Sequence, residues 1–162
     1  MNTFATPSSA NALAFLAAPA PRGGAPIASW IAQVAAAVIM GQTLFFKFCG
    51  APEAIYIVTT LGVEPWGRYA TATFELIAAV LLLIPRLASL GALLTIGLMV
   101  GAIGSHLTKL GIVVKDDGGL LFGMGIVALL ASVAVLVLRR GQLAQLAFRA
   151  LGRGHPSDAM TR

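Results

Sequence analysis

The stretch GGLLFGMGIVALLASVAVLVL, residues 118–138, contains no charged side chain. It is long enough to carry an α-helix across a hydrocarbon core about 30 Å thick, which takes about 20 apolar residues. In lipid, every backbone polar group has to find its partner inside the spanning structure. The stretch therefore predicts a transmembrane helix.

Three further stretches have the same character. No charge occurs from residue 23 to 46, or from 87 to 108 with His106 taken as neutral, while the run from 66 to 84 holds Arg68 at its mouth and Glu75 near its centre. Residues 78–83 do not alternate in polarity, as a strand of a membrane β-barrel would. We therefore predict an all-α, polytopic membrane protein, an antiparallel four-transmembrane-helix bundle with spans 27–46, 66–84, 88–107 and 119–138.

The composition excludes other classes of protein. Hydrophobic residues make up 58% of the 162-residue chain and charged residues 10%, against roughly 25% charged in an ordinary soluble domain. So few charges cannot cover the surface of a small soluble monomer. The net charge of +5 comes from bases spread along span ends, without the basic patch that nucleic-acid binding needs. The expected partner is the lipid bilayer, and no nucleic acid.

The arrangement of bases predicts the topology. An even number of spans puts both termini on one side, and that side also collects more Lys and Arg near the span ends than the other side. The positive-inside rule then makes both termini cytoplasmic. We expect a disordered cytoplasmic tail over 1–26, a four-helix transmembrane domain over 27–140, and a cytoplasmic tail over 141–162 with a short amphipathic helix on the inner leaflet.

Glu75 is the one ionisable side chain deep in a predicted span. A lone charge there costs a few kcal/mol, so Glu75 should face the bundle interior and be protonated or paired. Arg68 shares its helix face but is two turns away, about 10.5 Å along the axis, which is too far for direct contact. The predicted polar pocket around Glu75 still includes Arg68, through a bridge, and we expect its other members from the outer ends of the neighbouring helices: Gln42, Lys47, His106 and Lys109.

Two interpretations of this cluster remain open, a structural polar clasp and a site that handles protons or a ligand. The single cysteine, Cys49, excludes a dithiol mechanism within one chain. With His106 as the one histidine near the membrane, a bis-histidine haem within one chain is excluded as well. Glu75 and His106 alone would leave a metal ion short of ligands, so no metal site is predicted.

Smaller signals concern packing and loops. Gly97, Gly101 and Ser105 recur at four-residue spacing, which favours close helix packing within the bundle, with a homodimer face as the alternative. Between the first two spans, Pro52 suits a helix start and Gly62 a stop, so a short helix is expected at the outer surface. The segment DDGG, residues 116–119, is expected to form a turn and a helix start.

Three segments resemble the DoxX family of small membrane proteins. They are GQTLFFK at 41–47, FELI at 74–77 and GAIGSHL at 101–107. The likeness extends over roughly 27–140 and includes the four-helix count. The resemblance implies a bacterial inner-membrane protein, since the family includes subunits of thiosulfate:quinone oxidoreductase. It supplies no agreed catalytic residues to carry over.

The leading hypothesis is a subunit or accessory of a quinone-linked membrane oxidoreductase. Glu75 and His106 would line a polar pocket that opens outward and exchange protons with a quinone. One alternative is a small proton-coupled transporter or exporter, which would require a homo-oligomer. Another is a non-catalytic membrane anchor for a soluble or membrane redox partner.

Overall fold

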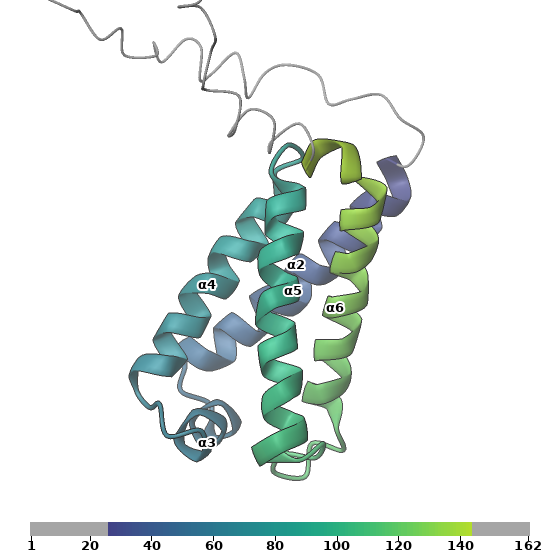
Figure 1. The fold of residues 1–162 in the computed structure, drawn as a ribbon. Coiled ribbons are helices and arrows are strands. Elements are labelled where there is room, and N and C mark those ends of the chain that lie inside the picture. The colour runs from purple at the N-terminus through teal and green to yellow at the C-terminus, as the bar shows by residue number, and fades with distance from the viewer. Residues whose placement is uncertain (1–25, 144–162) are drawn as a thin grey trace, which may run out of the picture.

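In the computed structural model, the structure describes residues 26–143. Four long helices pack antiparallel, and each is long and apolar enough to cross a membrane (Figure 1). They are α2 (Pro26–Phe48), α4 (Trp66–Leu83), α5 (Ala88–Ser105) and α6 (Leu120–Leu138). The predicted all-α four-span bundle is thus confirmed, and the chain is a multi-pass membrane protein. The α5 helix continues through a π-helical turn, η1 (His106–Leu110), which the sequence did not predict.

The short helix between the first two spans also forms, as α3 (Pro52–Thr60). Pro52 stands in its first turn, where the missing amide hydrogen is not needed. Gly62 follows the helix with a φ of 79°, a conformation that glycine adopts readily. The α3 helix lies at the end of the bundle opposite residues 26 and 143 (Figure 1). We call the α3 end the outer end and the opposite end the inner end.

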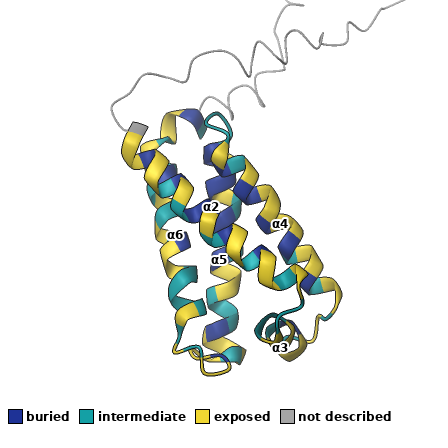
Figure 2. Cartoon of the chain, turned by 180° about the vertical axis from the view of Figure 1, so that it is seen from behind, coloured by how far each residue is buried: buried dark blue, intermediate teal, exposed yellow. Residues whose placement is uncertain are grey.

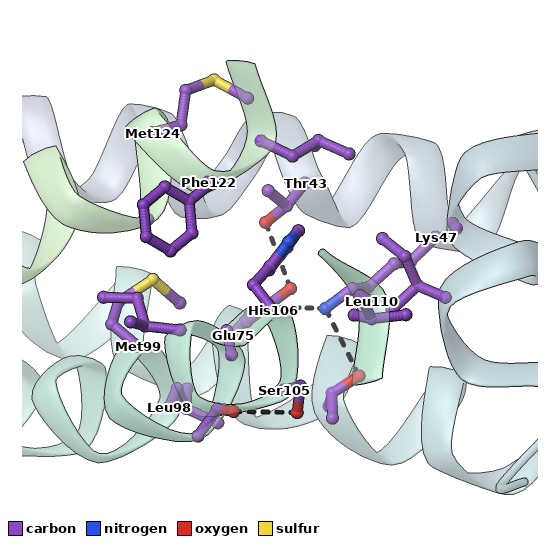
Figure 3. Close-up of a pocket in the computed structure, with 18 of the residues that line it drawn as sticks. Thr43, Lys47, Glu75, Leu98, Met99, Ser105, His106, Leu110, Phe122 and Met124 are labelled. Carbon is purple, nitrogen blue, oxygen red and sulfur yellow. Dashed lines mark hydrogen bonds and ion pairs between the residues drawn. The ribbon is translucent and has the colours of Figure 1, made fainter. Parts of the chain in front are cut away.

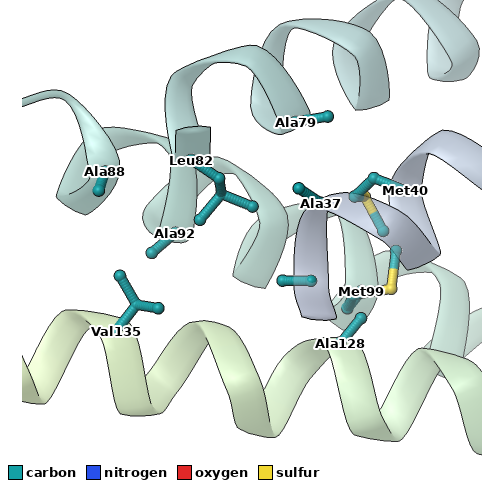
Figure 4. Close-up of a cluster of buried hydrophobic side chains, with 10 residues drawn as sticks. Ala37, Met40, Ala79, Leu82, Ala88, Ala92, Met99, Ala128 and Val135 are labelled. Carbon is teal, nitrogen blue, oxygen red and sulfur yellow. The ribbon is translucent and has the colours of Figure 1, made fainter. Parts of the chain in front are cut away.

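The inner half of the bundle is closed by small side chains. Buried positions are dark blue in Figure 2, and the buried hydrophobic cluster of the bundle (Figure 4) is mostly alanine, with Met40 and Met99 also lining the cavity described below: Ala36, Ala37, Met40, Ala79, Leu82, Ala88, Ala92, Met99, Ala128 and Val135. Small residues allow helices to approach closely in lipid, where van der Waals packing rather than hydrophobicity holds them together. The helices therefore leave little space between them in this half.

Gly91 marks the closest approach of α4 and α5. A Cβ atom there would lie 2.5 Å from the backbone nitrogen of Leu82 and 3.0 Å from the carbonyl oxygen of Ala78. The alternative of a homodimer face at Gly97 and Gly101 stays a prediction, but the expectation that they pack closely against another helix of the bundle is wrong, because a Cβ at either position would meet nothing within 4 Å. The reason is geometric. The short connection at 84–87 holds α4 and α5 together near the inner end, and they diverge toward the outer end.

A polar network ties the helices at the inner end. Arg139 Nε donates to Ser29 Oγ at 2.6 Å, and its Nη1 donates to the Pro85 carbonyl at 2.6 Å. Gln142 Nε2 donates to the same carbonyl at 2.8 Å, and Ser89 Oγ donates to Gln142 Oε1 at 3.2 Å. The network joins α2, α5, the end of α6 and the 84–87 connection. The predicted tails, including most of the amphipathic segment, lie outside the described residues.

Candidate functional site

Glu75 is buried and ion-paired. It lies nine residues after Trp66 in α4, about 13 Å along the helix axis, which places it near the middle of a bilayer. Lys47 Nζ lies 2.6 Å from Glu75 Oε1, and Thr43 Oγ1 donates to Glu75 Oε2 at 3.1 Å. The Glu75 side chain is 6% exposed and that of Lys47 22%. Lys47 therefore supplies the charge that compensates Glu75.

Arg68 acts on the backbone of Lys47 rather than on Glu75. Its Nη1 donates to the Lys47 carbonyl at 2.6 Å, which satisfies a carbonyl in the last turn of α2. Its Nη2 is paired with Glu64 Oε1 at 2.8 Å. Lys47 Nζ also donates to Thr71 Oγ1 at 3.3 Å. Arg68 and Thr71 thus fix where the lysine meets the carboxylate.

His106 begins the π-helical turn at the end of α5. Its Nδ1 lies 2.8 Å from the carbonyl oxygen of Gly111. Since a carbonyl can only accept, Nδ1 carries a hydrogen, and Nε2 is the nitrogen left for another partner. Within the described part of the chain nothing hydrogen-bonds to Nε2, although His106 is only 7% exposed. Phe122 packs against the ring with centroids 5.7 Å apart. The π-helical turn, a feature frequent at functional sites, therefore holds a buried histidine with one free nitrogen.

The ion pair and His106 line one cavity of about 400 Å³ in the outer half of the bundle. Its walls come from all four spans and η1, and the inner side of α3 covers its outer end through Ala54, Ile57, Val58 and Leu61. Most of the lining is apolar, with Met99 and Phe122 among the larger side chains. Figure 3 shows Thr43 and Lys47 converging on Glu75 beside His106. A small, mostly apolar cavity with a few converging polar groups is typical of small-molecule sites.

Three of the predicted site residues do not line the cavity, and one of them is Arg68, which is buried but bonds to the Lys47 carbonyl and to Glu64. Gln42 and Lys109 are both exposed, and neither lines the cavity. Thr43, the neighbour of Gln42, takes the place beside Glu75, because one position along a helix turns the side chain by about 100°. The signal that could have found Thr43 is its spacing of four residues from Lys47, which puts both on one helix face.

Other polar groups in the described residues fulfil structural roles. Among residues 26–143 no three His, Cys, Asp or Glu side chains are grouped to hold a metal ion, and Cys49 is exposed. Asp117 lies in the turn before α6, as the sequence predicted for residues 116–119, and its Oδ2 accepts from the Leu121 amide and its Oδ1 from the Val114 and Gly119 amides. These hydrogen bonds, that of Leu121 above all, lower the pKa of Asp117.

The chain is similar to one known protein family. Residues 31–135 match the DoxX-like family, a range that contains Lys47, Glu75 and His106. No curated protein and no solved structure matches the chain.

Proposed function

This chain belongs to the DoxX-like family, and we propose that its outer cavity binds the head group of a quinone for a membrane oxidoreductase. The membrane is the bacterial inner membrane, and both termini face the cytoplasm. The observation that carries the proposal is the free Nε2 of the buried His106, which shares an apolar cavity with the Lys47–Glu75 pair.

The lining of the cavity suits such a ligand. A quinone head is a flat, mostly apolar ring with carbonyl oxygens on opposite sides, which need hydrogen-bond donors when it is buried. Apolar side chains such as Met99 and Phe122 offer surfaces for the ring. Lys47, whose ammonium has three N–H groups and two acceptors in Glu75 and Thr71, carries a donor on one wall, and His106 stands on another. Lys47 and Glu75 neutralise each other, so the pair adds polarity without adding net charge.

The chain contributes binding and protons, while the electrons come from the partner. Reduction of a quinone to a quinol consumes two electrons and two protons. With a hydrogen on Nε2, His106 would hold one quinone oxygen and supply one of the two protons, and the opposite oxygen would take its proton from water. The Gly111 carbonyl keeps Nδ1 protonated throughout, so the exchanging proton is confined to Nε2.

A binding measurement tests this function. A short-chain benzoquinone is titrated into the full chain in lipid nanodiscs, and Kd is compared among variants. His106→Ala and Glu75→Gln are each expected to weaken binding at least tenfold. The matched controls are Gln42→Ala and Lys109→Ala, whose side chains are exposed outside the cavity, and these should stay within twofold. Equal affinity in all four variants would contradict the proposal.

A second candidate function is a proton-coupled carrier. One observation favours it, namely that the cavity lies in the outer half while small side chains and the inner network close the other half. This is the arrangement of a carrier that faces outward. Such a protein would release protons when its substrate binds, and Glu75→Gln would abolish the release. A non-catalytic anchor would instead retain its redox partner in pull-downs and bind no quinone.

A further inference from the structure

Two glycines of α5 are exposed and yet line the cavity. Gly97 and Gly101 both belong to the span Ala88–Leu110, near its middle. A Cβ atom at either position would meet nothing within 4 Å. At this depth an exposed surface faces hydrocarbon chains rather than water. The cavity therefore reaches the lipid-facing surface of the bundle at the two glycines.

The divergence of α4 and α5 accounts for the opening. The helices are in backbone contact at Gly91, close to the inner end, and separate toward the outer end. Thr71 and Glu75 line the cavity from α4, so the glycines of α5 stand across the gap from the polar side chains. The outer end is covered by α3 together with Leu110 of η1. A molecule that enters from the lipid between α4 and α5 therefore meets no side chain of α5 at Gly97 and Gly101.

We propose that the cavity is entered sideways from the hydrocarbon layer, between α4 and α5, through an opening at Gly97 and Gly101. Its ligand is a lipid-resident molecule whose polar head reaches Lys47, Glu75 and His106 while its tail stays in the opening. This ligand is an isoprenoid-tailed quinone, an identity that rests on the proposed function. His106 is only 7% exposed and lines the cavity, and no described residue hydrogen-bonds to its Nε2, so this nitrogen can meet a polar group of the ligand.

Filling the opening tests the inference. The double variant Gly97→Leu/Gly101→Leu places two branched side chains in it at positions where the Cβ atoms meet nothing within 4 Å. The matched control is Gly41→Leu, since Gly41 is exposed on α2, has nothing within 4 Å of its would-be Cβ and lies outside the cavity. Two probes with the same benzoquinone head, one bare and one with a ten-carbon tail, are titrated into the full chain in nanodiscs.

The double variant is expected to weaken binding of the tailed probe at least tenfold and that of the bare head less than threefold. Gly41→Leu should change neither. Unchanged affinity for the tailed probe in the double variant would overturn the sideways opening while leaving the proposed function standing. If neither probe binds the wild-type chain, the proposed function fails, and the opening is then judged by a measurement that needs no quinone.

That measurement uses a thiol placed inside the cavity. Because the chain has one cysteine, the variant Cys49→Ser/Thr43→Cys carries a single thiol, on the cavity wall. A bilayer-soluble maleimide should modify it faster than a membrane-impermeant one, and Gly97→Leu/Gly101→Leu should slow the bilayer-soluble reagent at least tenfold. A rate that the double variant leaves unchanged, or faster reaction with the impermeant reagent, would refute entry from the lipid.

Discussion

Removing Lys47 should destabilise the bundle more than removing the charge of Glu75. The two changes are Lys47→Met and Glu75→Gln, made singly and together in the full chain. The first leaves a carboxylate that is 6% exposed, with Thr43 as its remaining hydrogen-bond donor. The second leaves a lysine that is 22% exposed, hydrogen-bonded to Thr71 and long enough to reach toward the interface.

The distance between the charges sets the magnitude. At the observed 2.6 Å and an effective dielectric of about 20, two unit charges attract by about 6 kcal/mol. Desolvation offsets most of this gain, yet removing one partner of a buried pair typically costs roughly 3–5 kcal/mol. We expect that cost for Lys47→Met and roughly 1–3 kcal/mol for Glu75→Gln, because the remaining lysine is better solvated. The double variant, with no charge left, should cost about 1–2 kcal/mol.

Reversible unfolding in SDS, followed by far-ultraviolet circular dichroism, gives the free energy of unfolding for each variant. Lys109→Met serves as the matched control, because Lys109 is exposed, and should change stability by less than about 0.5 kcal/mol. Costs that add to within about 0.5 kcal/mol would show that Lys47 and Glu75 are not coupled. A larger cost for Glu75→Gln than for Lys47→Met would refute the stated asymmetry.

Three further predictions concern the scaffold, and SDS unfolding measures each of them. Gly91→Ala should cost roughly 1–3 kcal/mol because its methyl group meets the α4 backbone, whereas Gly97→Ala should be neutral or gain up to about 1 kcal/mol; equal effects would contradict the assigned crossing point. Asp117→Ala should cost roughly 1–2 kcal/mol at pH 7, because the Val114, Gly119 and Leu121 amides lose their acceptor. The pKa of Asp117 is lowered, so its charged carboxylate supplies this stabilisation. The difference in stability from wild type should therefore persist above about pH 3.8 and shrink as the pH falls below it; a difference independent of pH would contradict a charged Asp117 in this role. Arg139→Met should cost roughly 2–3 kcal/mol through two lost charged hydrogen bonds, and Arg140→Met, at an exposed position, less than about 0.5 kcal/mol.

Hydropathy predicted the architecture closely because length and lack of charge are sufficient to define a span. The observed α4 begins at Trp66, where the sequence placed it, and ends one residue earlier than predicted, at Leu83. The inward orientation of Glu75 followed from the cost of burying a charge in lipid. The bounds of α4 and the orientation of Glu75 could both be predicted from one segment of sequence and the lipid around it.

The partners of Glu75 could not be predicted to the residue, because they depend on how neighbouring helices are rotated. Gln42 and Thr43 are adjacent and both polar, and the rotation of α2 alone puts Thr43 against the carboxylate. Likewise, the sequence of α5 alone does not predict a π-helical turn at His106. Two hydrogen bonds between His106 and Gly111 accompany this turn, one from the ring Nδ1 to the Gly111 carbonyl and one from the Gly111 amide to the His106 carbonyl.

The glycines of α5 show a different limit. Gly91 is needed because the α4 backbone lies against it, whereas Gly97 and Gly101 border open space. The sequence shows a glycine in a helix in both cases. The four-residue spacing of Gly97 and Gly101 is the same as that of a helix-packing motif. The crossing geometry of α4 and α5 is needed to tell a contact from an opening.

The central claim, that His106 Nε2 meets the ligand, can be measured directly by ¹⁵N solid-state NMR of the full chain in lipid. The chain has two histidines, His106 and His155, so few imidazole signals need to be assigned. On saturation with a short-chain benzoquinone, the account predicts a shift of the His106 Nε2 resonance and none at His155. An unchanged His106 Nε2 signal while the quinone is bound would contradict it.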